Sequence, residues 1–504
     1  MNRLLAGWVG LVGIGLLSGC GGSGNNADPF PPNGGGGGGG INYTPGVFQP
    51  SSTFANQCNR VAENHFLRSW TNEFYLWYDE VPDLNPANYE TIEYFDLLKV
   101  PQDRFHDWID TETWEQLSQA GVLIGYGAQW YIIASTPPRQ VIVAFTEPGS
   151  PAANAGLERG DEILRVDGED LVNGDTQQIV DTLNAGLFPE DDGEEHDFRV
   201  RKRSGQEVDI TMVSDEITIV PVQNVKTIET NGERVGYMLF NDHIATSQLA
   251  LVEAIETLRD ADIDDLVLDI RYNGGGYLDI ASQLAYMIAG NSRTTGQVFE
   301  RIEFNDKYPN TNPITGAPLQ PTPFHTTTIS IGNVAPGAPL PTLDLDRVYV
   351  LTTAATCSAS EAIMNGLRGV NVDVYQIGST TCGKPYGFYP EDNCDITYFS
   401  IQFQGFNAKD FGDYGEGFEP DIAGSPNEGA LVSGCEAPDD FDRDLGDEQE
   451  TMLATALSFR ASNNQACPPV TSFAPDKQLK TMETQRKAVM PKHPFRLNRI
   501  YRDM

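Results

Sequence analysis

Residues Thr352 to Gly387, TTAATCSASEAIMNGLRGVNVDVYQIGSTTCGKPYG, decide how the chain folds around its candidate site. They follow an apolar run, Arg347 to Leu351, that predicts a buried strand. Ser358-Ala-Ser-Glu361 has the form of a capping box, which places Ser358 at the N-terminus of a helix. A second apolar run, Val372 to Ile377, predicts the next strand, and a Gly-Lys-Pro turn after it carries Lys384. The pattern predicts that Ser358 and Lys384 meet at one sheet edge as a Ser/Lys catalytic pair, although an ordinary helix cap and a solvated lysine fit the same residues.

A regular alternation of strands and helices precedes this stretch. Val235 to Phe240 and Asp265 to Ile270 predict strands, and apolar residues between 251 and 258 mark one face of a helix. This alternation predicts an α/β layer with partly parallel strands covered by crossover helices. The second strand leads into the glycine turn Tyr272-Asn-Gly-Gly-Gly276. Because functional groups gather at the carboxyl ends of such strands, we expect this turn and the helix start at Ser358 to supply nucleophile and oxyanion hole for acyl transfer.

Two segments of the C-terminal half do not follow this alternation of strands and helices. Residues 291–341 are rich in Pro, Thr and Gly, and we interpret them as an insertion before the strand at Arg347. Residues Thr397 to Phe406 (TYFSIQFQGF) predict one strand with alternating faces.

Residues 111–222 change to short strands separated by glycine turns, with a strand at Gln140 to Phe145 and another at Asp161 to Val166. The sequence EPGSPAANAGLERGDEILRVDG, from Glu147 to Gly168, strongly resembles a PDZ domain. PDZ domains add a partner's C-terminal peptide as a strand to a sheet edge and hold its carboxylate with backbone N–H groups. The resemblance places that loop near Ile124 to Gly127, which makes Gly125, Tyr126 and Gly127 candidate substrate-binding residues.

The segment before it, residues 55–110, is predicted to form a small helical cap. Phe66, Trp70, Phe74 and Trp77 recur along one helix face, and such an aromatic stripe is typical of a core. Residues 20–54 contain seven consecutive glycines from Gly34 to Gly40 and are expected to form a flexible tether. The basic segment 471–504 is expected to be a disordered tail.

The N-terminus has the features of a targeting segment. Arg3 supplies positive charge, Leu4 to Leu17 is a short apolar run, and Leu17-Ser-Gly-Cys20 closes it. This ending resembles a bacterial lipobox, which implies a signal peptide over residues 1–19, lipid on the Cys20 thiol and contact with a membrane through that lipid. Gly21 in that resemblance favours the outer membrane, on the periplasmic side or at the surface. A plain secretory cleavage site is the alternative.

Composition limits the partners. The net charge of −38 arises from 71 acidic and 33 basic residues, which argues against nucleic acid as a partner because its phosphates require basic patches.

Six cysteines remain after Cys20, and an even number in an exported chain suggests up to three disulfides. Cys357 directly precedes Ser358, and Cys382 lies two residues before Lys384, so we hypothesise a Cys357–Cys382 bridge between the two motifs. The spacing of cysteines and histidines does not indicate a zinc site, and we expect no metal. The remaining cysteines could not be paired from the sequence; they are Cys58, Cys394, Cys435 and Cys467.

The combination of these motifs resembles the carboxyl-terminal processing (tail-specific) serine peptidases over about residues 60–465. The resemblance implies an α/β multi-domain protein with a helical N-terminal cap, a PDZ-like domain at 111–222 and a Ser/Lys peptidase core with a mixed sheet at 223–470. It makes Ser358 the nucleophile and Lys384 the general base, which must be neutral and therefore buried. The backbone amides of Gly274 or Gly275 and of Ala359 become the oxyanion donors. It also implies peptide or protein substrates with accessible C-termini and no cofactor.

One position departs from the family pattern. Many members carry a glutamine four residues after the lysine, where it orients the amine, whereas this chain has Phe388. Ser360 is the competing nucleophile. Two other functions remain open: a Ser-His hydrolase that uses His243, and a non-catalytic lipoprotein that binds peptides through its PDZ-like domain.

Overall fold

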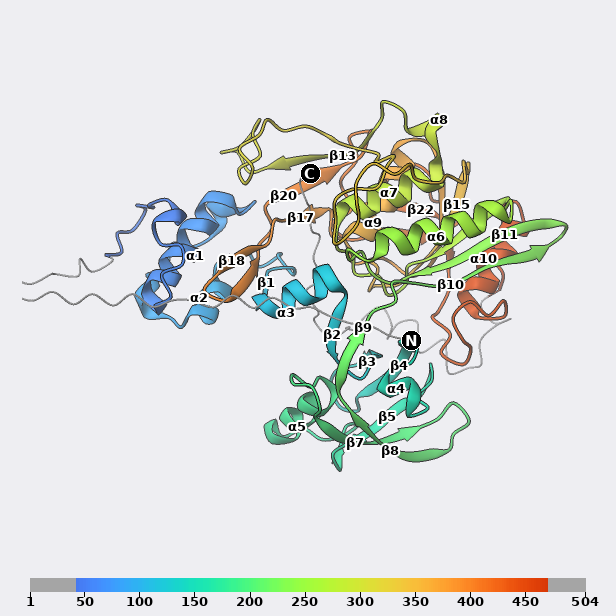
Figure 1. The fold of residues 1–504 in the computed structure, drawn as a ribbon, viewed down its shortest axis with the longest axis horizontal. Coiled ribbons are helices and arrows are strands. Elements are labelled where there is room, and N and C mark those ends of the chain that lie inside the picture. Colours follow the sequence, from blue (N-terminus) through green and yellow to red (C-terminus); the bar gives the residue numbers. More distant parts are fainter. Residues whose placement is uncertain (1–41, 470–504) are drawn as a thin grey trace, which may run out of the picture. The chain divides into compact units, whose positions relative to one another are not determined.

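The computed structural model describes residues 42–469 (Figure 1). The predicted signal peptide with Cys20, the tether before residue 42 and the basic tail at 471–504 lie outside these residues. Residues 43–469 lie within one compact unit. Within the described part of the chain, no helix combines the length and the apolar character needed to cross a membrane.

The N-terminal region is built on helices α1 (Arg60–Phe74) and α2 (Thr91–Leu97). Phe66 and Trp70 of the predicted aromatic stripe are buried, as a core face requires. The last part of the predicted tether, residues 43–54, packs against α1, because the Arg68 guanidinium binds Asp83, the backbone of residues 44 and 47, and the ring of Phe48. The folded chain therefore begins before residue 55.

The region ends in strand β1 (Asp107–Asp110), which pairs with β19 (Ile396–Phe399) far along the chain. The disulfide Cys58–Cys394 makes a second link between the same two parts.

The PDZ-like region starts with a helix rather than a strand. Helix α3 (Thr111–Glu115) and a π-helical turn (Gln116–Ala120) bury Trp114 and Leu117 in the main core. Strand β2 (Val122–Gly125) then pairs with β9 (Asp215–Thr218). The sheet that follows has the order β3-β4-β5-β7-β8, with β6 on β5. Its elements are β3 (Ala128–Ala134), β4 (Gln140–Thr146), α4 (Pro151–Asn154), β5 (Glu162–Val166), β6 (Glu169–Asp170), α5 (Gln177–Leu187), β7 (Glu195–Arg201) and β8 (Glu207–Val213).

The main core is a seven-stranded mixed sheet in the order β10-β11-β12-β15-β16-β22-β21. β10 and β11 pair antiparallel, and the remaining neighbours are parallel, which confirms the predicted mixed α/β layer. The strands are β10 (Val222–Thr230), β11 (Glu233–Phe240), β12 (Asp265–Asp269), β15 (Arg347–Thr352), β16 (Asp373–Gly378), β21 (Glu419–Asp421) and β22 (Leu431–Glu436).

Helices cover both faces of this sheet, because successive apolar side chains of each strand point to opposite faces and both faces must be buried. Leu266 and Leu268 face α6 (Ser247–Asp260), α7 (Leu278–Ala289) and α9 (Ala359–Gly369), which lie together in Figure 1. Val267 and Tyr349 face α10 (Thr451–Ala461) on the other side. The carboxyl ends of β12 and β15 therefore emerge at one edge between two apolar layers.

The connecting segments contain short elements of their own, and one expectation about them is wrong in detail. The insertion at 291–341 contains α8 (Asn291–Thr294), β13 (Val298–Phe304) and β14 (Thr322–Pro323). The single strand expected at 397–406 is two strands, β19 and β20 (Phe403–Phe406), in different sheets. β19 lies between β1 and β18 (Glu391–Asn393), whereas β20 lies between β13 and β17 (Tyr386–Gly387). The strand is interrupted at Gln402. The side chain of this residue accepts a hydrogen bond from the Tyr389 N–H and donates one to the Tyr389 carbonyl.

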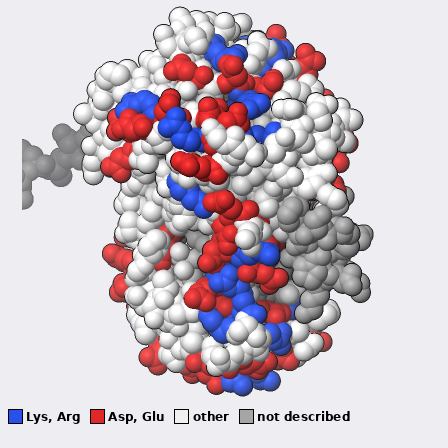
Figure 2. Space-filling view, turned by 90° about the vertical axis from the view of Figure 1, so that its right-hand side faces the viewer, with Lys and Arg blue, Asp and Glu red and all other residues white. Residues whose placement is uncertain are grey.

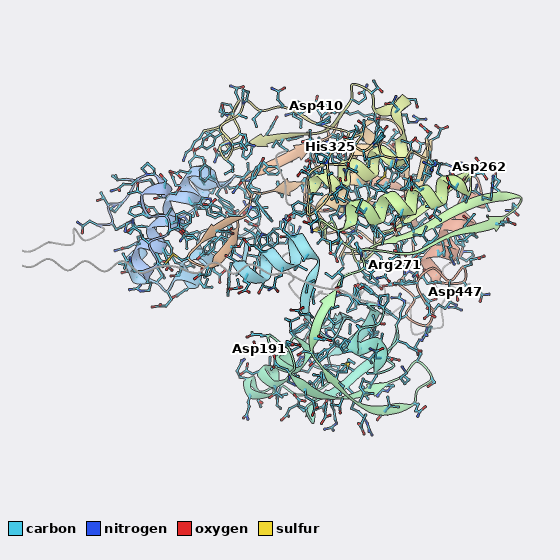
Figure 3. The ribbon with its side chains drawn as sticks, in the orientation of Figure 1. Asp191, Asp262, Arg271, His325, Asp410 and Asp447 are labelled. Atoms are coloured by element: carbon cyan, nitrogen blue, oxygen red, sulfur yellow. A yellow bond between two sulfur atoms is a disulfide. The ribbon has the colours of Figure 1, made fainter. Side chains whose placement is uncertain are left out.

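A buried charge network lies at the end of β12 (Figure 3). Arg271 is fully buried and binds the carboxylates of Asp269, Asp439 and Glu450. Arg159 of the PDZ-like region joins it through Asp439 and donates to the Tyr272 hydroxyl at 2.6 Å. Although burial acts in the opposite direction, the two guanidiniums hold the pKa of Asp439 below its ordinary value. The network connects the PDZ-like region to the start of the glycine turn.

Candidate active site

Ser358 is the N-cap residue of α9 and directly follows the turn that leaves β15. Its backbone has φ 61° and ψ −116°. Residues other than glycine rarely adopt this conformation, and those that do are concentrated at functional sites. The Ser358 hydroxyl is buried and has no hydrogen-bond partner among the described residues. The hydrogen bond of the predicted capping box runs from Ser358 N–H to the Glu361 carboxylate, and the serine oxygen lies at the positive end of the helix.

The predicted glycine turn lies against this serine. A side chain on Gly275, which has φ +102°, would place its Cβ 2.8 Å from Ser358 Cβ and 2.9 Å from Ala359 N. Only glycine fits this approach, which explains the run of glycines after Asn273. Cys357 N–H also donates to the Asn273 carbonyl at 3.0 Å, so the turn and the start of α9 form one unit.

The three predicted oxyanion donors differ in their state. Ala359 is the first residue of α9, and the N–H of such a residue has no acceptor within its own helix. The Gly275 N–H, by contrast, donates to Asn273 Oδ1 at 3.0 Å. Gly275 can serve an oxyanion only after that hydrogen bond breaks, which leaves Gly274 as the nearer match to the prediction in this turn.

Glu361 joins the two predicted catalytic motifs. One of its oxygens accepts the N–H of Ser358 at 2.9 Å and the N–H of Lys384 at 2.8 Å. The other accepts the N–H of Gly383 and the hydroxyl of Thr381. Burial raises the pKa of Glu361, and these hydrogen bonds act against the rise. The sequence identified Glu361 only as a helix cap, whereas in the fold it also holds the lysine turn beside the serine.

A disulfide makes a second link between the same segments. Cys357 and Cys382 are bonded, with their Cα atoms 5.1 Å apart, which confirms the bridge hypothesised from the sequence. It joins the residue before Ser358 to the turn that carries Lys384. The third disulfide, Cys435–Cys467, lies on the α10 side of the sheet.

Lys384 is fully buried beside two aromatic rings. Its Nζ lies 4.7 Å from the centre of the Phe388 ring and 4.9 Å from the centre of the Phe105 ring. Phe388, four residues after the lysine, therefore contacts the amine, and Phe105 comes from the N-terminal region. Burial between apolar rings disfavours the charged form of an amine, whereas the ring faces attract it. The sequence could not identify Phe105, because it lies far from Lys384 along the chain.

Ser360 and His243 both contact the glycine turn but not the predicted nucleophile. The Ser360 hydroxyl donates to the Asn273 carbonyl at 3.0 Å, so it is committed to holding the turn. His243 Nδ1 lies 2.9 Å from Asn273 Oδ1, and its Nε2 has no hydrogen-bond partner among residues 42–469. Since Asn273 Oδ1 is an acceptor, Nδ1 carries the proton.

The neutral state of His243 gives a testable dependence of stability on pH. Burial lowers the pKa of His243 to about 3, far below the ordinary value of 6.5. Between these values the unfolded chain binds a proton that the folded chain does not, so the free energy of unfolding falls as the pH is lowered. From pH 6.5 to 4.5 this residue should contribute a loss of about 2 kcal/mol. The free energy of unfolding in urea should be measured at pH 6.5 and pH 4.5. Its decrease between the two should be smaller by about 2 kcal/mol in His243→Asn than in wild type. Equal decreases would refute the proposed role of His243 in the pH dependence of stability.

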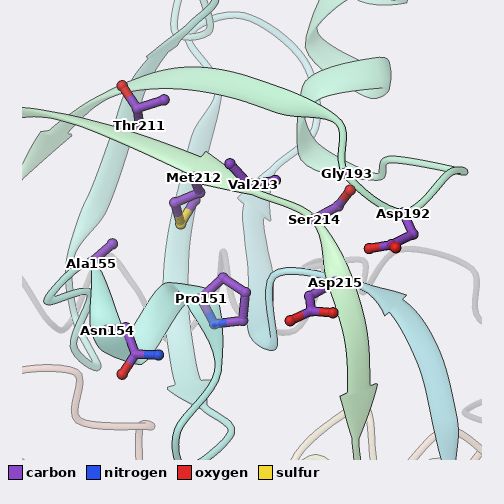
Figure 4. Close-up of a pocket in the computed structure, with 10 residues that line it drawn as sticks. All are labelled: Pro151, Asn154, Ala155, Asp192, Gly193, Thr211, Met212, Val213, Ser214 and Asp215. Carbon is purple, nitrogen blue, oxygen red and sulfur yellow. The ribbon is translucent and has the colours of Figure 1, made fainter.

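The predicted PDZ-like loop lines a cavity. Gly125, Tyr126 and Gly127 border a cavity of about 840 Å³ together with residues of β3, of α5 and of the π-helical turn. A separate depression of about 560 Å³ lies between α4 and β8 (Figure 4), and none of the three loop residues lines it. The structure therefore places the sequence-predicted loop at the cavity beside β3. Neither Ser358 nor Lys384 borders these two cavities.

Two groups of side chains have metal-like proximity in the described residues. Cys58 and Cys394 lie with Glu63, and Cys357 and Cys382 lie with Glu361. In each group the two cysteines form a disulfide, whose sulfurs are not the thiolates that bind metals.

Comparisons with known proteins assign three regions of the chain. Residues 234–423 match peptidase family S41, residues 143–186 match the PDZ domain, and residues 62–108 match the peptidase S41 N-terminal domain. A carboxyl-terminal-processing protease of Picosynechococcus is 28% identical over 304 residues, which cover 57% of this chain and 61% of the relative. The chloroplastic carboxyl-terminal-processing peptidase 2 of Arabidopsis thaliana is 30% identical over 161 residues, 31% of this chain and 29% of that protein. The chain thus spans less than two thirds of the length of these relatives.

A solved structure shares the fold. The crystal structure of a putative S41 protease from Bacteroides fragilis superposes with a TM-score of 0.59 at 24% identity, covering 79% of this chain and 97% of that one. Together with the matched regions, this likeness confirms the expected multi-domain α/β architecture. Residues 234–423 therefore carry a peptidase family S41 domain and residues 143–186 a PDZ domain, in a chain that is similar to carboxyl-terminal-processing proteases.

Proposed function

We propose that this protein is a serine endopeptidase that cleaves proteins or peptides near their C-termini, with Ser358 as nucleophile and Lys384 as general base. The observation that carries the proposal is the Glu361 carboxylate, which binds the backbone of both residues. A hydroxyl without a hydrogen-bond partner at a strained helix start and a buried amine are thereby held on adjacent segments. The hydroxyl and the amine that a Ser/Lys dyad needs thus stand on adjacent segments, which supports the proposal.

The proposed reaction has two halves. Ser358 Oγ attacks the scissile carbonyl carbon while neutral Lys384 Nζ accepts the hydroxyl proton, and the oxyanion is held by backbone N–H groups of Ala359 and Gly274. Lys384 then passes the proton to the leaving amine as the peptide bond breaks, which leaves an acyl ester on Ser358. Water attacks the ester with Lys384 again accepting a proton. The acid product leaves and the serine recovers its hydrogen.

Access to the site requires a movement of the protein. Ser358 and Lys384 are both fully buried, and Phe105 covers the amine from the N-terminal region. Arg104 holds this cover in place by donating to the carbonyls of Cys382 and Gly415. We infer that a substrate reaches the serine only when this contact opens, which also keeps water away from the amine.

Cleavage of an unstructured protein tests the assignment of the nucleophile. Ser358→Ala should lower kcat/KM by roughly 10⁴-fold or more, because it removes the hydroxyl that is proposed to form the acyl ester. Ser360→Ala removes a neighbouring hydroxyl that is already hydrogen-bonded, and it should keep activity within about tenfold while losing about 1–2 kcal/mol of stability. The reverse ranking would make Ser360 the nucleophile.

Two other functions predict different results in the same assay. In a Ser-His hydrolase that uses His243, His243→Asn abolishes cleavage while the protein stays folded. The contact of His243 Nδ1 with Asn273, rather than with Ser358, favours a role in holding the glycine turn instead. A non-catalytic binding protein would bind peptides through the PDZ domain without turnover by the wild type.

We also propose that the protein is anchored in a bacterial cell envelope through lipid on Cys20. Support for this comes from the Leu-Ser-Gly-Cys sequence alone. Metabolic labelling with a fatty acid should mark the wild type and not Cys20→Ala, and labelling of both would contradict the anchor.

A further inference from the structure

The cavity beside β3 has the form of a site for an extended peptide. β3 pairs with β4 on one side only and is an edge strand of its sheet, so its other side can accept another strand. Trp130 and Ile132 of β3 line the cavity, and Leu187 and Phe188 line it from the end of α5. Phe188 is 38% exposed and adds its ring to the apolar surface of the cavity. These residues form an apolar wall next to a free strand edge.

The charged residues of this cavity are all of one sign. Four carboxyl residues line it, and none of its lining residues is lysine, arginine or histidine. Asp110 and Glu190 are exposed at its border, whereas Glu147 and Asp242 are buried. The surface in Figure 2 differs, because acidic and basic side chains are interspersed on the face shown. The one-sided charge of the cavity is therefore a local feature and not only a consequence of the acidic composition.

The two exposed carboxylates at the border carry the charge that a bound peptide would meet. The buried Glu147 accepts hydrogen bonds from the Val220 N–H and the Gln223 side chain. Asp110 accepts the N–H and hydroxyl of Thr113 at the start of α3. Neither Asp110 nor Glu190 forms an ion pair with a described residue of the chain. A peptide with acidic side chains, or with its terminal carboxylate alone, meets repulsion here that a cationic side chain offsets.

We propose that this cavity selects substrate segments in which lysine or arginine accompanies apolar residues, so that the protein prefers basic substrate tails. The proposal rests on the proposed peptidase function and names its substrate class. The apolar side chains of the segment pack against Leu187 and Phe188 while its backbone pairs with β3. Its cationic side chains then lie near Asp110 and Glu190.

Peptide binding to the full chain carrying Ser358→Ala tests the preference without cleavage. Two fluorescent peptides end in the same apolar residues and differ only in having lysines or glutamates upstream. The lysine peptide should bind about tenfold more tightly at low salt, because each exposed pair contributes up to about 1 kcal/mol. The difference should shrink in about 0.5 M salt, where charges are screened within a few ångströms. Equal affinities at low salt overturn the proposal.

A matched pair of variants locates the preference. Asp110→Asn with Glu190→Gln keeps the size of both side chains and the oxygen that caps α3, and it should reduce the ratio of affinities to less than about twofold. Asp175→Asn with Glu253→Gln makes the same chemical change at exposed acids outside the cavity and should leave the ratio unchanged. An equal fall in both double variants would assign the preference to net charge and overturn the proposal.

The wild-type protein separates this proposal from the proposed function. If it cleaves both peptides at equal kcat/KM, the preference is overturned and the peptidase function stands. If it cleaves neither peptide although the lysine peptide binds more tightly, the peptidase function fails and the selective groove stands.

Discussion

Lys384→Met is expected to lower kcat/KM for an unstructured protein substrate by about 10³-fold or more, because no other amine replaces the general base. Methionine retains the length and apolar contacts of the side chain between Phe105 and Phe388. The backbone N–H that binds Glu361 is unchanged, so the turn should keep its position. The loss should therefore appear in kcat while the protein stays folded.

The control is a lysine in the same domain but outside the site. Lys409 donates to the Asn427 carbonyl at an exposed position, and Lys409→Met should retain wild-type cleavage within about twofold, as surface substitutions usually do. Unfolding by urea establishes that both variants are folded. Cleavage by Lys384→Met within tenfold of wild type would refute the dyad, and the Ser-His alternative would then be tested with His243→Asn.

The parts of the site that follow a strand could be predicted from the sequence. Asn273 to Gly276 follow β12 and Ser358 follows β15, and these strands are parallel neighbours in the sheet. Alternating strands and helices in the sequence are enough to bring their carboxyl ends together. The close approach of Gly275 to Ser358 is the result.

The surroundings of Lys384 could not be predicted in this way. Phe105 reaches the amine from a region whose position depends on the pairing of β1 with β19 and on the Cys58–Cys394 bridge. Such contacts between distant segments leave no periodic signal in either one. The same reason explains why Thr397 to Phe406 was predicted as one strand, since the break at Gln402 comes from its contact with Tyr389. Hydrophobic periodicity in the sequence predicts the helices and strands. The surroundings of Lys384 depend on pairings between segments that are far apart in the sequence.

The Ser358 hydroxyl shows a different limit. The capping box predicted from the sequence is present at the start of α9, where the Ser358 N–H donates to the Glu361 carboxylate at 2.9 Å. Ser358 has a positive φ of 61°, and its buried hydroxyl makes no hydrogen bond with a described residue. The sequence Ser358-Ala-Ser-Glu361 thus fits both an ordinary helix cap and a nucleophile, and the backbone conformation of Ser358 is the feature that favours the nucleophile.

The second large effect is expected from removal of the disulfide beside the site. Cys357→Ala with Cys382→Ala should lower the free energy of unfolding by about 3 kcal/mol, the loss expected for a loop of this length. It should also lower kcat/KM by about 10²-fold, since a displacement of about 1 Å between reacting groups has that effect. After the bridge is removed, the two segments are still joined by Glu361 and by the hydrogen bond from Cys382 N–H to the Thr356 carbonyl, so the loss is partial.

A second disulfide provides a control of matched loop length. The two bridges span 25 and 32 residues, so Cys435→Ala with Cys467→Ala should lose a similar amount of stability in urea unfolding. That bridge packs on the α10 face of the sheet, opposite α9, and its loss should leave kcat/KM of the folded protein unchanged. Equal cleavage by both double variants would mean that Cys357–Cys382 only stabilises the fold. A loss confined to the first would show that the bridge holds the serine and lysine in reacting position, because stability is matched between the two.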